Sequence, residues 1–402
     1  MTNSNARAAF GIVLLVCAAS WAGAQNVQTL YGFWGGTRGM NPRILVPQSD
    51  GSAFGDAGGG TGCPVGLCGM IYKLSAKQGD VVIHGFTGAE DGADPRGLVP
   101  DGKGGIYGVT FSGGAYGQGN IFRVDASGEF QVVYSFAGSP DGAMPNGLVL
   151  DAAGNLYGTT YVGGAYNAGS VFELDRTGKE NVIYSFTGGS GGYLPGGGVL
   201  DASGNFYGST FAGGVGCLGN PGCGLVFEVN TTTGEENTLY SFTGTGGDGE
   251  TPGHLLRDSH GNLYGTTGGG GNSSCEGGCG TLFRLTQGPG GNWSETILHT
   301  FTSGADGAYP AGLVATKDSI YGTTGGAVYG CSGSSCGTVY QLSPTGEFTT
   351  IYTFSGGAGG EDPYLQFQDG TGALIGTTYS GGHLNCLDSQ GYGCGTVFRL
   401  TP

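Results

Sequence analysis

The chain has few charged residues, and basic residues are the scarcer kind. Among its 402 residues, 14 are Lys or Arg and 30 are Asp or Glu, which gives a formal net charge of −16. A surface that binds nucleic acid needs basic side chains that neutralise phosphates. The composition therefore argues against nucleic acid as a partner and leaves cationic partners such as Ca²⁺ open.

Long apolar segments are missing outside the first 24 residues. Residues 1–24 combine Arg7 with an apolar run and a triplet of small residues before Gln25, which is the pattern of a cleaved secretory signal peptide. No later segment approaches the roughly 20 apolar residues of a membrane-spanning helix. We therefore expect a secreted or periplasmic protein without a transmembrane segment, whose mature chain, residues 25–402, forms one domain.

Glycine, by contrast, is abundant and periodic. The 92 Gly and 15 Pro would indicate disorder in a chain without periodicity, but the 21 Tyr and 20 Phe supply the large apolar side chains that disordered chains lack. An apolar residue followed by Gly recurs seven times at intervals of 50 to 57 residues, at Phe54-Gly55, Tyr107-Gly108, Tyr157-Gly158, Tyr207-Gly208, Tyr264-Gly265, Tyr321-Gly322 and Ile375-Gly376. Such a period predicts a repeat architecture.

Each repeat has the pattern of four short strands, the first of which follows a proline, as in PNGLVLD (residues 145–151). The second and third strands lack apolar–polar alternation, so both of their faces should be buried. Residues 27–33 match only a fourth strand, and the C-terminal GTVFRLTP ends after a third strand. A split repeat lets the first strand complete the last blade and removes free sheet edges. We therefore predict an all-β fold, a seven-bladed β-propeller closed by its N-terminal strand, with a glycine-rich β-solenoid as the alternative.

The repeat resembles a known tandem-repeat family. Its pattern is carried, for example, by Asp141-Gly142, Pro145, GNLYGTTYVGG (residues 154–164) and GSVFEL (residues 169–174). In these motifs it resembles the GloVer-type tandem repeats of secreted bacterial proteins, over nearly the whole mature chain. The resemblance implies an extracellular, propeller-like protein and carries no agreed activity.

Two kinds of connection share one end of the predicted propeller, which we call the top face. They lead from a fourth strand to the next first strand and from a second to a third strand, while tight hairpins of the type DxxGN occupy the other end, the bottom face. Ten cysteines follow the signal peptide and form local pairs between second and third strands: Cys63/Cys68, Cys217/Cys223, Cys275/Cys279, Cys331/Cys336 and Cys386/Cys394. In an exported chain, an even number of cysteines without zinc-ligand spacing favours disulfides over zinc. We expect these disulfides to shape the top face.

The top face also carries the candidate ligand-binding residues. They are Asp91, Asp141, Asp248, Asp306, Asp362, Tyr116, Tyr166 and Tyr309. Carboxylates that converge at a propeller mouth could bind Ca²⁺ or act as an acid–base pair on a sugar, but aspartate in the sequence Asp-Gly-x-x-Pro also favours a turn. Tyrosine near carboxylates suits glycan binding, although a loop tyrosine also serves to cap a blade.

The sequence has no catalytic motif that would assign a reaction. Of its five histidines, only His254 and His383 are placed to reach the top face, and no G-x-S-x-G nucleophile motif accompanies them. We therefore predict no catalytic and no metal-binding residues, and a monomeric, non-enzymatic binding propeller that recognises an extracellular glycan or protein through its top face. No cofactor is expected, with Ca²⁺ left open. The alternative function is a carboxylate-dependent enzyme that acts on polysaccharide, either a glycoside hydrolase or a lyase.

Overall fold

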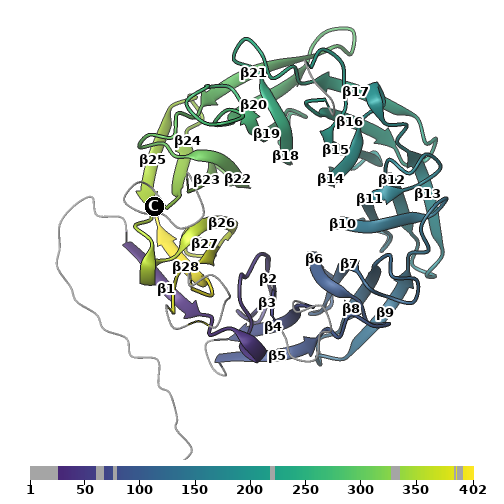
Figure 1. Ribbon diagram of the computed structural model, residues 1–402, viewed down its shortest axis with the longest axis vertical. Coiled ribbons are helices and arrows are strands. Elements are labelled where there is room, and N and C mark those ends of the chain that lie inside the picture. Colours follow the sequence, from purple (N-terminus) through teal and green to yellow (C-terminus); the bar gives the residue numbers. More distant parts are fainter. Residues whose placement is uncertain are drawn as a thin grey trace, which may run out of the picture.

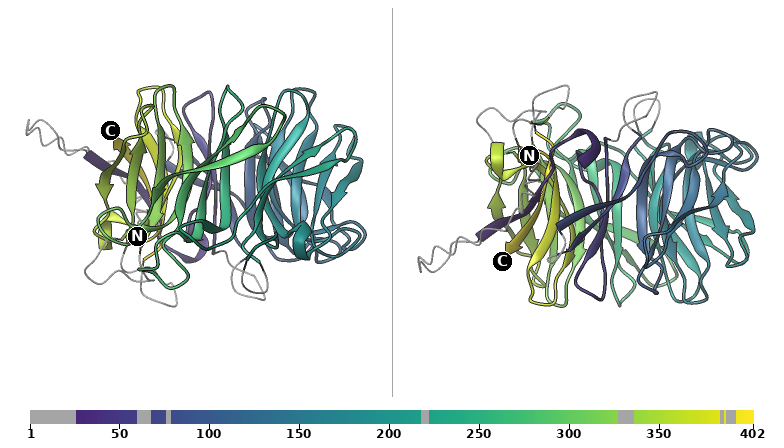
Figure 2. Two further views of the ribbon diagram at one scale, coloured as in Figure 1. Left: turned by 90° about the horizontal axis from the view of Figure 1, so that it is seen from above. Right: turned by 90° about the horizontal axis from the view of Figure 1, so that it is seen from below.

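Seven four-stranded antiparallel sheets are arranged as the blades of a propeller around a central channel (Figure 1). The computed structural model describes residues 26–59, 68–75, 79–217, 222–326, 336–383, 386 and 393–402. Residues 1–24, the predicted signal peptide, and Gln25 lie outside these residues. The predicted seven-bladed all-β architecture is confirmed, and Figure 2 shows that the connections gather at the two ends of the ring.

The strands of each blade are ordered from the channel outward. Blade 1 contains β2 (Leu45–Pro47), β3 (Ala53–Ala57), β4 (Met70–Ser75) and β5 (Gly79–Gly85). Blade 2 contains β6 (Ala93–Pro100), β7 (Ile106–Ser112), β8 (Asn120–Val124) and β9 (Phe130–Ser135). Blade 3 contains β10 (Gly142–Leu150), β11 (Leu156–Gly163), β12 (Ser170–Leu174) and β13 (Glu180–Ser185). Blade 4 contains β14 (Tyr193–Leu200), β15 (Asn205–Ala212), β16 (Leu225–Asn230) and β17 (Glu236–Ser241).

The remaining blades follow the same order. Blade 5 contains β18 (Gly249–Arg257), β19 (Leu263–Gly270), β20 (Thr281–Gln287) and β21 (Trp293–Thr300). Blade 6 contains β22 (Ala308–Ala315), β23 (Ile320–Gly325), β24 (Thr338–Leu342) and β25 (Phe348–Thr353). Blade 7 contains β26 (Glu361–Gln368), β27 (Leu374–Ser380), β28 (Thr396–Thr401) and the N-terminal strand β1 (Asn26–Gly32). Short 3₁₀ turns η1 (Gly36–Arg38), η2 (Gly189–Gly191) and η3 (Gly357–Gly359) lie in top-face connections.

The N-terminal strand closes the ring, as the split repeat predicts. Strand β1 pairs with β28 from Asn26↔Thr401 to Gly32↔Thr396. Just beyond β1, the Phe33 amide donates to the Gly395 carbonyl at 3.0 Å. The same phenylalanine follows every fourth strand and is 0–1% exposed in all seven blades, at Phe33, Phe86, Phe136, Phe186, Phe242, Phe301 and Phe354.

The hydrophobic core lies between neighbouring blades rather than inside any one of them. In blade 3 the second strand β11 is buried over Leu156–Thr160, so apolar residues face both sides of the sheet. Phe136 of blade 2 packs edge-on against Phe172 of blade 3, with ring centroids 5.1 Å apart. Each blade therefore buries its faces only when both neighbours are present.

The first strands differ from the prediction in where they begin. We expected each to start after its proline, but β10 begins at Gly142 and includes Pro145. The proline is tolerated because this strand is the edge of its sheet and faces the channel, so the missing amide costs no ladder hydrogen bond.

A latch built on this proline joins each blade to the previous one. The residue before the proline has φ between 51° and 57° in every blade, at Asn41, Asp94, Met144, Leu194, Thr251, Tyr309 and Asp362. Its amide donates to a carbonyl in the preceding blade, as from Met144 to Gln118 at 2.8 Å. The proline itself packs on the glycine that follows the accepting residue in the preceding blade. A Cβ at Gly119, for example, would lie 2.6 Å from Cδ of Pro145. These contacts explain why proline and glycine recur at fixed places in the repeat.

Candidate functional site

The top half of the central channel forms a pocket of about 1180 Å³. All seven blades contribute lining residues, which come from the first strands near their prolines and from the second strands. None of these lining residues belongs to a bottom hairpin. We call its upper level the channel mouth, defined by the residue before each proline together with the second-strand residue beside it.

Aromatic side chains surround much of the channel mouth. The second strands place Phe111, Tyr161, Phe211 and Tyr379 there, and in blade 6, where the second strand ends in Gly325, the first strand supplies Tyr309 instead. Phe211 and Tyr379 are 49% and 44% exposed, although they line the pocket. Large apolar rings left open to a cavity are available to a ligand.

Phe111 is engaged within the protein instead. The guanidinium of Arg96 lies 3.9 Å from the centre of its ring, a cation–π contact. Its edge also meets Tyr161, with the two ring centroids 5.8 Å apart. Phe111 therefore holds Arg96 against the face of its ring and Tyr161 beside it.

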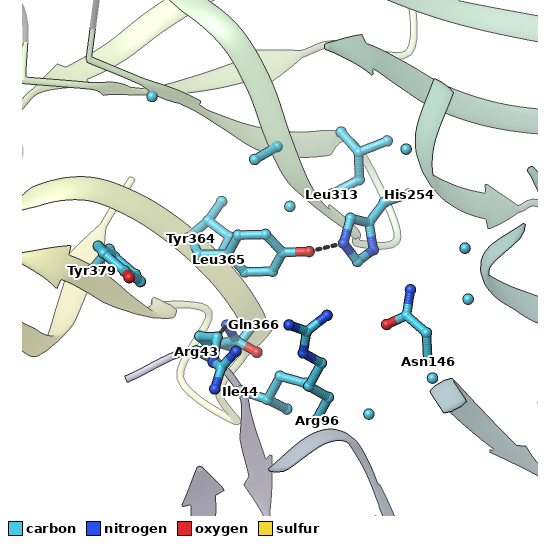
Figure 3. A pocket seen from close by; sticks show the side chains of 18 of the residues that line it. Arg43, Ile44, Arg96, Asn146, His254, Leu313, Tyr364, Leu365, Gln366 and Tyr379 are labelled. Atoms are coloured by element: carbon cyan, nitrogen blue, oxygen red, sulfur yellow. Dashed lines mark hydrogen bonds between the residues drawn. The ribbon is translucent and has the colours of Figure 1, made fainter. Parts of the chain in front are cut away.

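Below the mouth, the residues that follow the prolines make two unlike walls. They are Arg43, Arg96, Asn146, Gly196, Gly253, Ala311 and Tyr364, in the order of blades 1 to 7. Blades 1 to 3 thus present hydrogen-bonding side chains, whereas blades 4 to 6 present glycine and alanine. Figure 3 shows Arg43, Arg96 and Asn146 on one side of the pocket, with Tyr364 and His254 reaching into it.

A hydrogen bond between Tyr364 and His254 crosses the pocket (Figure 3). It links blade 7 to blade 5. Between them, the small residues Ala311 and Gly312 of blade 6 leave the space that the two rings occupy. Enclosure by the channel walls lowers the pKa of His254 and raises that of Tyr364. Both groups are therefore neutral near pH 7, and the hydrogen bond joins the Tyr364 hydroxyl to Nε2 of His254. We call this pair the crossbar.

The two arginines of the polar wall are neutralised by aspartates. Asp94 accepts from Nη2 of Arg43 at 2.5 Å and from Nη2 of Arg96 at 2.6 Å, and Asp56 lies 3.5 Å from Nε of Arg43. Burial raises the pKa of Asp94, but the two guanidinium charges outweigh this and hold it below its usual value. Burial raises the pKa of the wholly buried Asp56 to about 6 despite Arg43. At neutral pH the cluster carries two positive and two negative charges.

Of the sequence-predicted site residues, Asp362 and Tyr309 line this pocket. The Asp362 carboxylate accepts from the Gly326 amide at 2.8 Å, and burial raises its pKa. The other predicted aspartates accept hydrogen bonds within their own connections: Asp91 from Thr87, Asp141 from Ala137, Asp248 from Thr243 and Asp306 from Thr302. Their turn-forming role accounts for their recurrence.

The predicted aspartates do not converge on a metal. Among the described residues, no group of three or more His, Cys, Asp or Glu side chains is arranged to hold a metal ion. Tyr116 and Tyr166 are 63% and 64% exposed and do not line the pocket. A role for these two rim tyrosines in ligand binding remains a prediction.

Disulfides are present in the top-face connections. Both partners are described for Cys217–Cys223, Cys275–Cys279 and Cys386–Cys394. Cys68 and Cys336 are also disulfide-bonded, and the predicted partners Cys63 and Cys331 lie outside the described residues. The second cysteine of each pair carries the latch carbonyl, as Cys279 accepts from the Tyr309 amide at 2.9 Å.

Most of the pocket residues are not among the residues that the sequence predicts for the site. Arg43, Arg96 and Asn146 each follow a proline of the repeat, and Phe211 and Tyr379 each follow the motif G[ST]T. An alignment of the repeats would show that the residue after G[ST]T is aromatic in several blades. It would also show that the residue after the proline is polar in blades 1 to 3 and small in blades 4 to 6. The signal was therefore the departure from the repeat, rather than the repeat itself.

Comparison with known proteins identifies the repeat and the fold. The sequence model of the Gloeobacter/Verrucomicrobia repeat matches residues 19–220 and 141–336. No curated protein sequence matches the chain. Among solved structures, the extracellular domain of a protein assigned as a one-component system of B. thetaiotaomicron is 15% identical with a TM-score of 0.57, covering 94% of this chain and 42% of that one.

Other structural neighbours are more distant. A gluconolactonase from Xanthomonas campestris is 10% identical with a TM-score of 0.45, covering 94% of this chain and 99% of that one. A chain of a nidogen/laminin complex is 16% identical with a TM-score of 0.45, covering 71% of this chain and 89% of that one. At 15% identity, the likeness to the B. thetaiotaomicron domain shows the propeller fold alone. In the described part of the chain, no helix has the length and apolar character to cross a membrane.

Proposed function

The chain belongs to the Gloeobacter/Verrucomicrobia repeat family, and we propose that it is an extracellular, non-enzymatic binding propeller that holds a glycan in its channel mouth. The repeat family and the propeller supply the scaffold, and the disulfides and the signal-like residues 1–24 support export. A rigid ring that presents varied residues at one end is a common way to build a binding site.

The observation that carries this proposal is the pairing of open aromatic rings with planar polar groups in one pocket. Phe211 and Tyr379 offer flat apolar faces at the mouth, and Arg96 and Asn146 line the same pocket. A sugar ring has an apolar face that stacks on an aromatic ring and hydroxyls that both donate and accept hydrogen bonds. The pocket therefore matches a carbohydrate better than a purely apolar molecule.

The carboxylates of the pocket support binding over catalysis. An enzyme that cleaves a glycan commonly uses two carboxyl groups that flank the scissile bond. Asp56 and Asp94 are instead committed to Arg43 and Arg96. Asp362 is held by a backbone amide, which leaves no free pair among the described lining residues.

The test is a glycan-array screen of the mature protein, residues 25–402, with and without Ca²⁺, followed by titration of the strongest glycan into variants. We expect Phe211→Ala and Tyr379→Ala to weaken binding by about tenfold each, or about 1.4 kcal/mol. Tyr116→Ala and Tyr166→Ala are the matched controls, because these aromatics are also exposed on the top face but lie outside the pocket. Normal binding by the mouth variants with loss in the rim variants would place the ligand on the rim and overturn the mouth assignment. Release of new reducing ends from the bound glycan would favour the enzymatic alternative.

A further inference from the structure

We infer that the channel mouth recognises the end of an uncharged glycan chain, one chain end per protein molecule. This inference rests on the proposed function, because it specifies the glycan that the same pocket takes. It follows from three features of the pocket: a wall that is closed on every side, a limited depth, and a charge cluster that is balanced within the protein.

The closed wall restricts the direction of entry. Lining residues come from all seven blades, so the wall surrounds the channel axis completely. A ligand inside the pocket must therefore enter along this axis from the top face. A polymer that lay across the top of the channel would touch the residues of the channel mouth but could not reach Arg96 or Asn146 below them. Only a terminus can contact both levels.

The depth of the pocket limits how much of a chain it holds. In blade 7 the lining runs from Asp362 to Gln366, which is about 13 Å at the usual rise of about 3.3 Å per strand residue. The crossbar of Tyr364 and His254 spans the pocket within this depth. A chain therefore meets the crossbar and stops, rather than threading through the propeller.

The two unlike walls give the terminal sugar a defined place. Gly196 and Gly253 leave open space on the side of blades 4 and 5, whereas the crossbar lies over Ala311 of blade 6. The hydrogen-bonding side chains of Arg43, Arg96 and Asn146 face that space from blades 1 to 3 (Figure 3). A sugar that fills the open side therefore turns its hydroxyls toward the polar wall.

The charges of the polar wall favour an uncharged ligand. Asp94 bridges Arg43 and Arg96, and Asp56 accompanies Arg43, so the arginines have no unmatched charge for an anion. A carboxylate on the sugar would have to displace Asp94 and would also approach a chain of net charge −16. Neutral hydroxyls bond to guanidinium and amide groups without disturbing these pairs.

The experiment is calorimetric titration of the mature protein with defined oligosaccharides. The probes are neutral β-1,4-glucan, α-1,4-glucan, β-1,3-glucan and β-1,4-mannan chains of two to ten sugars, with oligogalacturonate as the anionic counterpart. For the neutral chain that binds, we expect one protein per chain at every length, an affinity that stops rising after the first few sugars, and less than twofold change between 50 and 500 mM NaCl.

A filled-pocket variant locates the chain end. Gly196→Phe projects a ring into the open side, where a Cβ would meet only Ser209, at 3.7–3.8 Å. It should weaken binding at least tenfold with an unchanged melting temperature. Ala315→Phe, at the exposed bottom end of the first strand β22, is the control and should bind normally.

Each contrary outcome has its own meaning. Several proteins per long chain, or affinity per chain that rises in proportion to length, would overturn recognition of chain ends. Tighter binding of oligogalacturonate that weakens with salt would overturn the preference for uncharged glycans, and equal binding by Gly196→Phe would overturn the position in the pocket. If none of the neutral or anionic chains bound, the proposed glycan function would itself fail.

Discussion

At the scale of single residues, paired side chains join the outer strands of neighbouring blades. The Tyr240 hydroxyl donates to Glu295 of the next blade at 3.1 Å. Where the next blade has phenylalanine in place of glutamate, the tyrosine is replaced by histidine: His84 stacks on Phe130 with centroids 3.7 Å apart, and His299 stacks on Phe348 at 3.6 Å. These pairs explain why two of the five histidines occupy outer strands.

The outer glutamates should make stability depend on pH. Burial, helped by the nearby charges of Asp141 and Asp248, raises the pKa of Glu180 and Glu295 from 4.5 to about 7. Between pH about 4.5 and 7 the folded chain therefore holds more protons than the unfolded chain, and its stability falls as the pH rises through this window. We expect Glu180→Gln and Glu295→Gln to flatten this fall in melting temperature, measured from pH 4.5 to 8. The exposed Glu347→Gln is the control, and an unchanged slope in the first two variants would contradict the assignment.

The latch between blades can be tested with two glycines that share one backbone conformation. Gly119 and Gly154 have φ of 93° and 92°, but a Cβ at Gly119 would lie 2.3 Å from the Thr110 carbonyl oxygen and 2.6 Å from Cδ of Pro145, whereas a Cβ at Gly154 would meet nothing within 4 Å. We expect Gly154→Ala to cost about 1–2 kcal/mol because of the backbone alone. Gly119→Ala should cost about 1–3 kcal/mol more because of overpacking against both neighbours. Equal losses in a urea denaturation experiment would show that the close packing around Gly119 contributes nothing.

At the scale of elements, the disulfides fix connections that also carry the latch. In blades 2 and 3 the carbonyls of Gln118 and Ala168 accept the same hydrogen bond, although these connections contain no disulfide. The latch therefore does not require the disulfide, and the disulfide adds to its stability.

Removing one disulfide should weaken the fold without abolishing it. The Cys275–Cys279 bond closes a loop with a sequence separation of 4. For a loop this short, the chain-entropy relation gives about 2 kcal/mol. We expect Cys275→Ser/Cys279→Ser to lower the free energy of unfolding by about this amount in urea while the far-ultraviolet spectrum stays native. A chain that failed to fold would show that the disulfide, rather than the latch, holds this connection.

The strands were easier to predict from the sequence than the site. Repetition marks elements, because every blade must bury the same residues, such as the phenylalanine that follows each fourth strand, represented by Phe136 and Phe186. A binding site depends on how blades differ, and its position depends on which side chains of the first strand face the channel. The irregular register of β10 between Asn146 and Leu148 decides this, and a sequence pattern does not reveal such a shift. The aspartates were selected because they recur, which is a property of turns.

At the scale of the whole molecule, closure depends on one terminal strand. Strand β1 covers β28, and Phe33 extends the buried cluster between blades 7 and 1. Deleting residues 27–33 should expose the edge of β28, lower the melting temperature markedly and promote aggregation, because free edges pair with other chains. Differential scanning fluorimetry and size-exclusion chromatography measure both effects. A deletion variant that melts and elutes like the parent would contradict closure by this strand.

The central claim is that the ligand binds in the channel mouth, and a crystal structure of the mature protein with the strongest glycan from the array tests it most directly. The account predicts density for one chain end inside the pocket, with a sugar ring stacked on Phe211 or Tyr379 and hydroxyls within hydrogen-bonding distance of Arg96 and Asn146. Density against Tyr116 or Tyr166, or on the bottom face, with the pocket holding only water, would contradict it.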